Sequence, residues 1–267
     1  MDYNKQIREI ADYFKKHEKA EKDFKIGVEL EHFVVDKNTL QTISYYGEGG
    51  VEETLKELGK QGWHGEYEGD YLLSLSKGEK VITLEPGSQL EFSTRPKKNI
   101  KDIEKEYVEF LEEIIPILDR KNQGLIAIGY HPVTKIDQIK LLPKKRYDYM
   151  FKYFKTKGSH AHNMMKGTAS VQVAIDYKSE EDYIKKFKVA NALSPLLYIM
   201  FDSGYYFEGK RWDRYGLRAY IWENCDRDRS GIVEGSFDED FGYEKYAEYI
   251  LNRPPIFMDD GKKTYYT

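Results

Sequence analysis

The chain has 267 residues, of which 42 are Lys or Arg and 46 are Asp or Glu, so its formal net charge is -4. This near balance excludes a nucleic-acid-binding protein held by a broad basic field. Hydrophobic residues make up 40% of the chain, enough for a core and too many for a disordered chain, so we expect one large domain or two small ones.

The first hundred residues predict alternating helices and strands. Apolar residues at helical spacing indicate a helix over residues 3–18, and two-residue alternation indicates a strand over residues 25–35. A second helix is predicted over residues 51–60. A hairpin over residues 71–83 and a strand over residues 89–94 follow.

The next segment predicts one long helix between strands. Asn99 is placed to cap that helix, whose buried face extends to Leu118. A short strand is expected over residues 125–130, a basic loop over residues 143–166, and an alternating strand over residues 168–176.

Two more helices complete the pattern. Ser179 begins a helix that is predicted to extend toward Phe201, and a final helix is expected over residues 241–251. The chain has no internal repeat and no flexible linker, so residues 1–267 predict a single α+β domain on a largely antiparallel sheet.

Three of the predicted strands carry carboxylates or carboxamides on the face opposite their apolar one. The residues are Glu29 and Glu31, then Gln89 and Glu91, then Gln172 and Asp176. Converging carboxylates repel one another unless a cation lies among them, and oxygen-only ligands select a hard ion such as Mg²⁺ or Mn²⁺. The pattern predicts such a site if the strands are neighbours; the alternative is a set of strand faces that simply face water.

The other candidates are weaker. His160 and His162 have the spacing of a strand metal pair but lie in the predicted basic loop, and Cys225 has acidic neighbours that would raise its pKa. Residues 226–231 predict either a solvated turn or guanidinium groups that bind carboxylate or phosphate. The common phosphate-binding glycine motifs are absent, so any nucleotide would be held by metal and side chains.

The N-terminal residues, the hydropathy and the cysteine count indicate the cellular compartment of the protein. Residues 1–5 lack the apolar core of a signal peptide, and no stretch approaches the roughly 18 apolar residues of a membrane span. We therefore expect a cytoplasmic protein with neither a membrane nor a nucleic-acid partner. Cys225 is the only cysteine, which excludes an intrachain disulfide and a thiolate zinc cluster.

Several segments together resemble a known family. In chain order they are residues 27–32 (GVELEH), 84–93 (LEPGSQLEFS), 168–177 (TASVQVAIDY), the helix around 185–187 (KKF), 221–231 (IWENCDRDRSG) and 237–243 (FDEDFGY). They resemble blocks of the glutamate–cysteine ligases of the plant and proteobacterial type, and the similarity extends from about residue 25 to the end.

The resemblance implies a fold and a reaction. It implies a glutamine-synthetase-like catalytic domain, in which a curved antiparallel sheet forms a cradle for ATP, Mg²⁺ or Mn²⁺, and glutamate. In this family ATP phosphorylates the γ-carboxylate of glutamate, and the amine of cysteine then displaces phosphate to give γ-glutamylcysteine. Two alternatives stay open: a ligase that joins glutamate to another amine, and a non-catalytic module that binds nucleotide or glutamate.

The resemblance also implies roles for individual residues. The metal ligands it implies are Glu29, Glu31, Glu91 and, in the same block as the last, Glu85. The substrate contacts it implies are Arg218, Trp222, Gln172 and Gln89, and the catalytic residues are Arg218 and Arg229. The family continues into Phe-Pro-Glu-Val-Arg and Glu-Met-Arg blocks that residues 252–267 do not resemble. We therefore expect a second chain or a further segment to complete the site, or a shorter homologue with altered activity.

Overall fold

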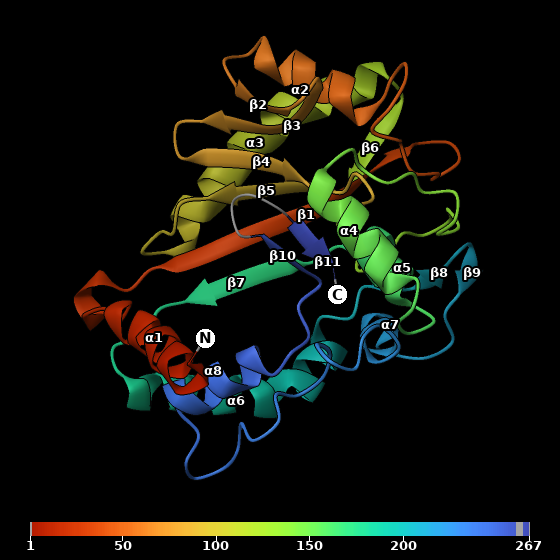
Figure 1. The fold of residues 1–267 in the computed structure, drawn as a ribbon. Coiled ribbons are helices and arrows are strands. Elements are labelled where there is room, and N and C mark those ends of the chain that lie inside the picture. Colours follow the sequence, from red (N-terminus) through yellow and green to blue (C-terminus); the bar gives the residue numbers. More distant parts are fainter. Residues whose placement is uncertain (1, 260–263, 267) are drawn as a thin grey trace.

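The computed structural model describes residues 2–259 and 264–266, and its centre is an open seven-stranded sheet (Figure 1). The strand order is β2-β3-β4-β5-β1-β6, and β7 also pairs with β1. The strands are β1 (Ile26–Asp36), β2 (His64–Glu68), β3 (Tyr71–Lys77), β4 (Lys80–Leu84), β5 (Leu90–Thr94), β6 (Gln123–Ile126) and β7 (Val171–Ile175). Every pairing between these strands is antiparallel, which confirms the predicted α+β class.

Two short hairpins and the helices surround the sheet. The hairpins are β8 (Tyr206–Phe207) with β9 (Lys210–Arg211) and β10 (Phe257–Asp259) with β11 (Thr264–Tyr266). The helices are α1 (Tyr3–Lys16), the 3₁₀ turn η1 (Glu21–Asp23), α2 (Val51–Gly59), α3 (Ile100–Arg120), α4 (Lys145–Phe154), α5 (Ala161–Gly167), α6 (Glu180–Met200), α7 (Leu217–Glu223) and α8 (Tyr243–Leu251). None of the helices in the described residues combines the length and apolarity that a bilayer crossing needs.

Side-chain caps fix where three helices begin. The side-chain oxygens of Asp2, Asn99 and Ser179 each accept a hydrogen bond from the backbone N–H three residues later. Such a cap satisfies one of the N–H groups that the first helical turn leaves without a partner. The two caps that the sequence predicted, Asn99 and Ser179, are confirmed.

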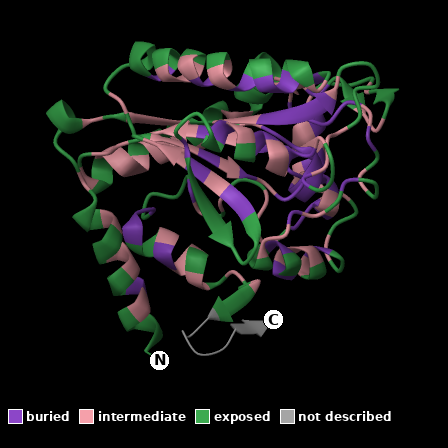
Figure 2. Cartoon of the chain, turned by 90° about the horizontal axis from the view of Figure 1, so that it is seen from above, coloured by how far each residue is buried: buried purple, intermediate pink, exposed green. Residues whose placement is uncertain are grey.

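The core lies between one face of the sheet and α3, which runs behind β4 and β5 in Figure 1. Leu30 of β1 lies opposite Phe92 of β5, and the ring of Phe92 stacks on that of Phe110 of α3 at 4.5 Å. His32 lies on this same apolar face, buried, with Nε2 2.6 Å from Oη of Tyr107. Figure 2 shows the buried positions, in purple, gathered along the sheet and the helices packed against it.

One predicted element is wrong, and another has shifted bounds. The strand expected over residues 125–130 is β6, which begins earlier and ends at Ile126. The segment expected as a basic loop contains α4 and α5. Tyr147 and Phe154, seven residues apart on α4, are buried in the core. Lys and Arg residues elsewhere in the segment over 143–166 obscure this apolar helical spacing, and packing against the core stabilises the helix.

Candidate active site

The structure brings together three of the predicted carboxylates on neighbouring strands. In the pairing of β1 with β5, Glu31 lies opposite Glu91, and Glu29 lies opposite Ser93. On the other edge of β1, Glu29 lies opposite Gln172 of β7. Directly opposed residues of antiparallel strands project from the same side of the sheet. These polar residues therefore share the face opposite the one that α3 covers, which we call the carboxylate face.

Glu31 is held at both of its oxygens. Oε2 accepts a hydrogen bond of 2.8 Å from the backbone N–H of Ser170, and Oε1 accepts one of 2.8 Å from Nε2 of Gln172. Burial raises the pKa of Glu31 to about 7, and the charges of Glu85 and Glu91 act in the same direction. Burial and the neighbouring like charges therefore both disfavour the ionised form of this carboxyl group.

Glu85 reaches the carboxylate face from the turn before β5. The turn depends on Gly87, because a Cβ there would collide with the backbone carbonyl of Lys166. Burial raises the pKa of Glu85, and the charge of Glu91 raises it further. One oxygen of Glu85 accepts a hydrogen bond of 3.3 Å from Oη of Tyr147 on α4. The turn thus adds a fourth carboxylate beside those of the strands.

Two cationic groups at the start of α4 face these carboxylates. The charges of Arg146 and Lys144 both lower the pKa of Glu85, against the larger effect of burial. The Arg146 guanidinium lies 4.8 Å from the ring centre of Tyr147 and donates a hydrogen bond of 2.9 Å to its Oη. Burial lowers the pKa of Lys144, and the charge of Arg146 lowers it further. These two groups were not predicted from the sequence, because the segment over 143–166 was expected to be a loop. The helical spacing of the apolar residues of α4 was the signal that could have located them.

Arg218 lies beside the start of β7 and interacts with Glu31. Its Nη1 donates to the backbone carbonyls of Ala169 at 2.7 Å and Gly129 at 3.2 Å. Burial lowers the pKa of Arg218, and the charge of Glu31 opposes that effect. The guanidinium is thus fixed by backbone groups next to the carboxylate face. Its predicted contact with a substrate stays a prediction, as does that of Trp222, which is half-buried one helical turn further along α7.

Gln89 is buried, with 2% of its surface exposed, and its amide is bonded at both ends to backbone. Oε1 accepts a hydrogen bond of 2.7 Å from the N–H of Gly87, and Nε2 donates one of 2.8 Å to the carbonyl of Thr168. Gln89 therefore ties the turn that carries Glu85 to the residues that lead into β7. The structure gives it a positioning role, and the substrate contact stays a prediction.

Arg229 makes its contacts with a different set of residues. Its Nη1 donates to Oδ2 of Asp226 at 2.6 Å and to Oη of Tyr153 at 2.7 Å, and its Nη2 donates to the carbonyl of Pro254. Asp226 is buried, so this ion pair anchors the turn over residues 226–231. The structure does not bring Arg229 into contact with the glutamates of the carboxylate face, and its catalytic role stays a prediction.

The four glutamates suit a hard divalent cation by the chemistry of their donors. Carboxylate oxygens are the ligands that Mg²⁺ and Mn²⁺ prefer. Burial, followed by the charge of Glu91, raises the pKa of both Glu29 and Glu85, so a cation beside them would favour their ionised forms. Among the described residues, no group of three or more His, Cys, Asp or Glu is already arranged as a ligand set. A metal ion bound by all four glutamates therefore stays a prediction, and it would require rotation of their side chains.

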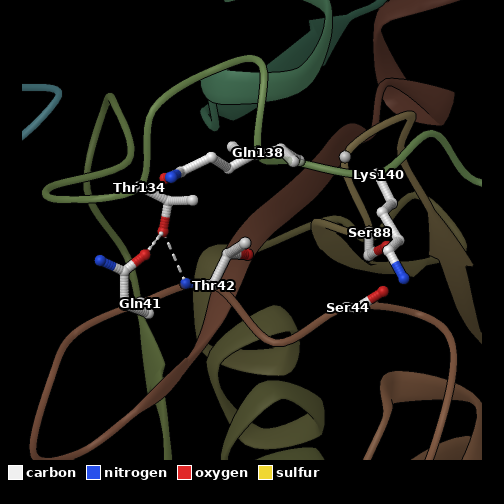
Figure 3. Close-up of a pocket in the computed structure, with 9 residues that line it drawn as sticks. Gln41, Thr42, Ser44, Ser88, Thr134, Gln138 and Lys140 are labelled. Carbon is white, nitrogen blue, oxygen red and sulfur yellow. Dashed lines mark hydrogen bonds between the residues drawn. The ribbon is translucent and has the colours of Figure 1, made fainter.

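A pocket of about 330 Å³ adjoins the turn that carries Glu85 (Figure 3). Its lining includes Gly87 and Ser88 of that turn, and Lys140, which lies beside Ser88. Thr134 Oγ1 donates to Oε1 of Gln41 at 2.8 Å and accepts from the N–H of Thr42 at 2.8 Å. The residues that line it include no Asp or Glu, so this pocket is distinct from the carboxylate face.

Comparison with known proteins identifies the family. The sequence profile of glutamate–cysteine ligase family 2 (GCS2) matches residues 25–266. The chain belongs to this family. Proteins named glutamate–cysteine ligase, chloroplastic, include one from Brassica juncea and one from Arabidopsis thaliana, each 33% identical over 240 residues and 90% of this chain. One from Medicago truncatula is 31% identical over 257 residues and 96% of this chain.

The matched part of these relatives is limited. It amounts to 46%, 45% and 50% of the Brassica, Arabidopsis and Medicago proteins, so the chain spans about half the length of the curated relatives it matches. The family confirms the resemblance seen in the sequence blocks. The names of the relatives place those proteins in the chloroplast, and a cytoplasmic location for this chain stays a prediction.

Proposed function

We propose that the carboxylate face is part of the catalytic centre of an ATP-dependent ligase that joins glutamate to cysteine. Membership of the glutamate–cysteine ligase family supports the proposal. The observation that carries it is the register that sets Glu31 opposite Glu91, with Lys144 and Arg146 close by. Carboxylates for a metal ion beside cations for phosphate oxygens are the groups that phosphoryl transfer needs.

The proposed reaction has two steps. A γ-carboxylate oxygen of glutamate attacks the γ-phosphorus of ATP, ADP leaves, and γ-glutamyl phosphate forms. The amine nitrogen of cysteine then attacks the acyl carbon, loses a proton, and expels inorganic phosphate to give γ-glutamylcysteine. A bound Mg²⁺ or Mn²⁺, held by Glu29, Glu31, Glu85 and Glu91, would offset the negative charge of the phosphate oxygens.

The residues of the chain have distinct tasks in this proposal. Lys144 and Arg146 would neutralise the phosphoryl group, and Arg218, held by backbone carbonyls, would bind a substrate carboxylate. Gln172, already bonded to Glu31, would orient that carboxylate. Because burial raises the pKa of Glu31 to about 7, uptake of a cation there would release a proton near neutral pH.

The decisive experiment measures ADP release as a function of glutamate, cysteine and Mg²⁺. We expect release only when all three are present with ATP, and loss of that release in Glu91→Gln. The matched control is Glu66→Gln on the exposed strand β2, which should keep the parent activity. Binding of Mg²⁺–ATP without turnover would support a non-catalytic module instead. A preference for an amine other than cysteine would contradict the assigned acceptor.

A further inference from the structure

Strand β7 is an exposed edge of the sheet. It pairs with β1 on one side, and no strand within residues 2–259 or 264–266 pairs with its other side. Its five residues are all exposed, with Val171 and Val173 at 61% and Ile175 at 59%. The strand contains no charge and no proline, the devices by which proteins normally protect an edge from pairing. This edge therefore has the properties of one that another strand covers.

Helix α6 is exposed in the same region. None of its 21 residues is buried, although apolar side chains occur on all sides of its second half. The exposed apolar residues of α6 and its C-cap are Val189, Leu193, Leu196, Leu197, Tyr198, Ile199, Met200 and Phe201. A helix that is apolar all round belongs in the interior of a larger assembly.

The two exposed elements form one groove, and α6 runs below β7 in Figure 1. Val171 and Val173 of β7 line it together with Leu197 and Phe201, and its volume is about 660 Å³. Val171 lies opposite Leu30, on the apolar side of the sheet. The groove is therefore on the other side of β7 from the carboxylate face.

We propose that this β7–α6 surface is the docking site for a polypeptide equivalent to the half of the family that this chain does not match. The occupant would add a strand to the free edge of β7 and pack apolar side chains against α6. The size of the occupant follows from the three relatives named above. This chain matches only 45% to 50% of their length, which leaves about half of each relative for the occupant. The inference rests on family membership and on exposure, and it does not depend on the ligase reaction.

Docking here would be transmitted to the carboxylate face. Ser170 and Arg218 both line the groove. The N–H of Ser170 is hydrogen-bonded to Glu31, and the charge of Arg218 acts on the same carboxylate. A strand bound at β7 would therefore fix the residues that hold Glu31, although it touches the opposite side of the sheet.

The test measures association rather than turnover. The docking proposal can therefore fail while the ligase assignment stands, and the ligase assignment can fail while the docking proposal stands. The chain is co-expressed with the unmatched remainder of the Brassica juncea relative, and the mass of the purified species is measured by light scattering. We expect a one-to-one complex in which hydrogen exchange slows at residues 171–175 and along α6. Val173→Lys should weaken association about tenfold or more, because it places a charge in an apolar contact.

The matched control is Val108→Lys, at an exposed valine of α3, which should associate like the parent. Both variants substitute exposed positions, and circular dichroism verifies that they fold. Absence of a complex, or a complex that Val173→Lys does not weaken, would overturn the proposal. So would a homodimer of this chain paired through β7, or binding of α6 to vesicles of phosphatidylcholine and phosphatidylglycerol.

Discussion

Replacing Glu31 by glutamine should stabilise the protein at alkaline pH in the absence of divalent cations. Glu31 lies against the like charges of Glu85 and Glu91, and burial raises its pKa from 4.5 to about 7. Ionising this group in the folded state therefore carries a free-energy cost. Glutamine is nearly the same shape and keeps an oxygen that can accept the N–H of Ser170, but it carries no charge to desolvate.

The size and the pH range of the effect follow from the pKa. A group whose folded pKa exceeds its unfolded pKa takes up its proton more readily when folded, so stability falls as pH rises from 4.5 to 7. The full pKa difference corresponds to a loss of about 3 kcal/mol in the free energy of unfolding. Because the side chain is partly exposed, we expect a loss of about 2 kcal/mol. The gain from Glu31→Gln should therefore be largest above pH 7 and disappear below about pH 4.5.

Urea unfolding of the parent and of Glu31→Gln between pH 5 and 9, with chelator present, tests this expectation. Glu66→Gln, on an exposed strand, is the control for the exchange of carboxylate for amide. Added Mg²⁺ should stabilise the parent and not Glu31→Gln. The difference in unfolding free energy between the two proteins should therefore shrink or change sign when the metal is present. A variant less stable than the parent at pH 8, or a difference that does not change with pH, would refute the reasoning.

Three further outcomes are expected. Glu91→Gln should weaken Mg²⁺–ATP binding in titration calorimetry at least tenfold while the unfolding midpoint stays within the range of ordinary surface variants; unchanged binding would show that Glu91 is not a ligand. Gln89→Leu should lower the free energy of unfolding by about 2–4 kcal/mol, because it leaves two buried backbone groups without partners; a loss under about 0.5 kcal/mol would contradict this. Burial raises the pKa of Cys225 to about 11, so iodoacetamide should label it at pH 8 only in denaturant, and rapid labelling of the folded chain would contradict its burial.

Local patterns predicted much of the fold correctly. The two-residue alternation of β1 put Glu29 and Glu31 on the side opposite Leu30, and the structure agrees. The side-chain caps at Asn99 and Ser179 depend on contacts within one helical turn, so the sequence suffices to locate them. Helix α4 was not predicted because the basic residues of the segment over 143–166 obscured the helical spacing of its apolar residues, which are buried against distant strands.

The sequence by itself determined the period of most elements, the residue types on each face of β1 and β5 and, through the ordered blocks, the family. Only the tertiary structure decided which strands are neighbours: that β1 lies between β5 and β7, with Glu31 opposite Glu91. It also decided that the basic start of α4 faces Glu85, and that β7 and α6 stay exposed. The physical reason is that periodicity is set by contacts along the chain, whereas strand order and the pKa of Glu31 depend on residues distant in sequence.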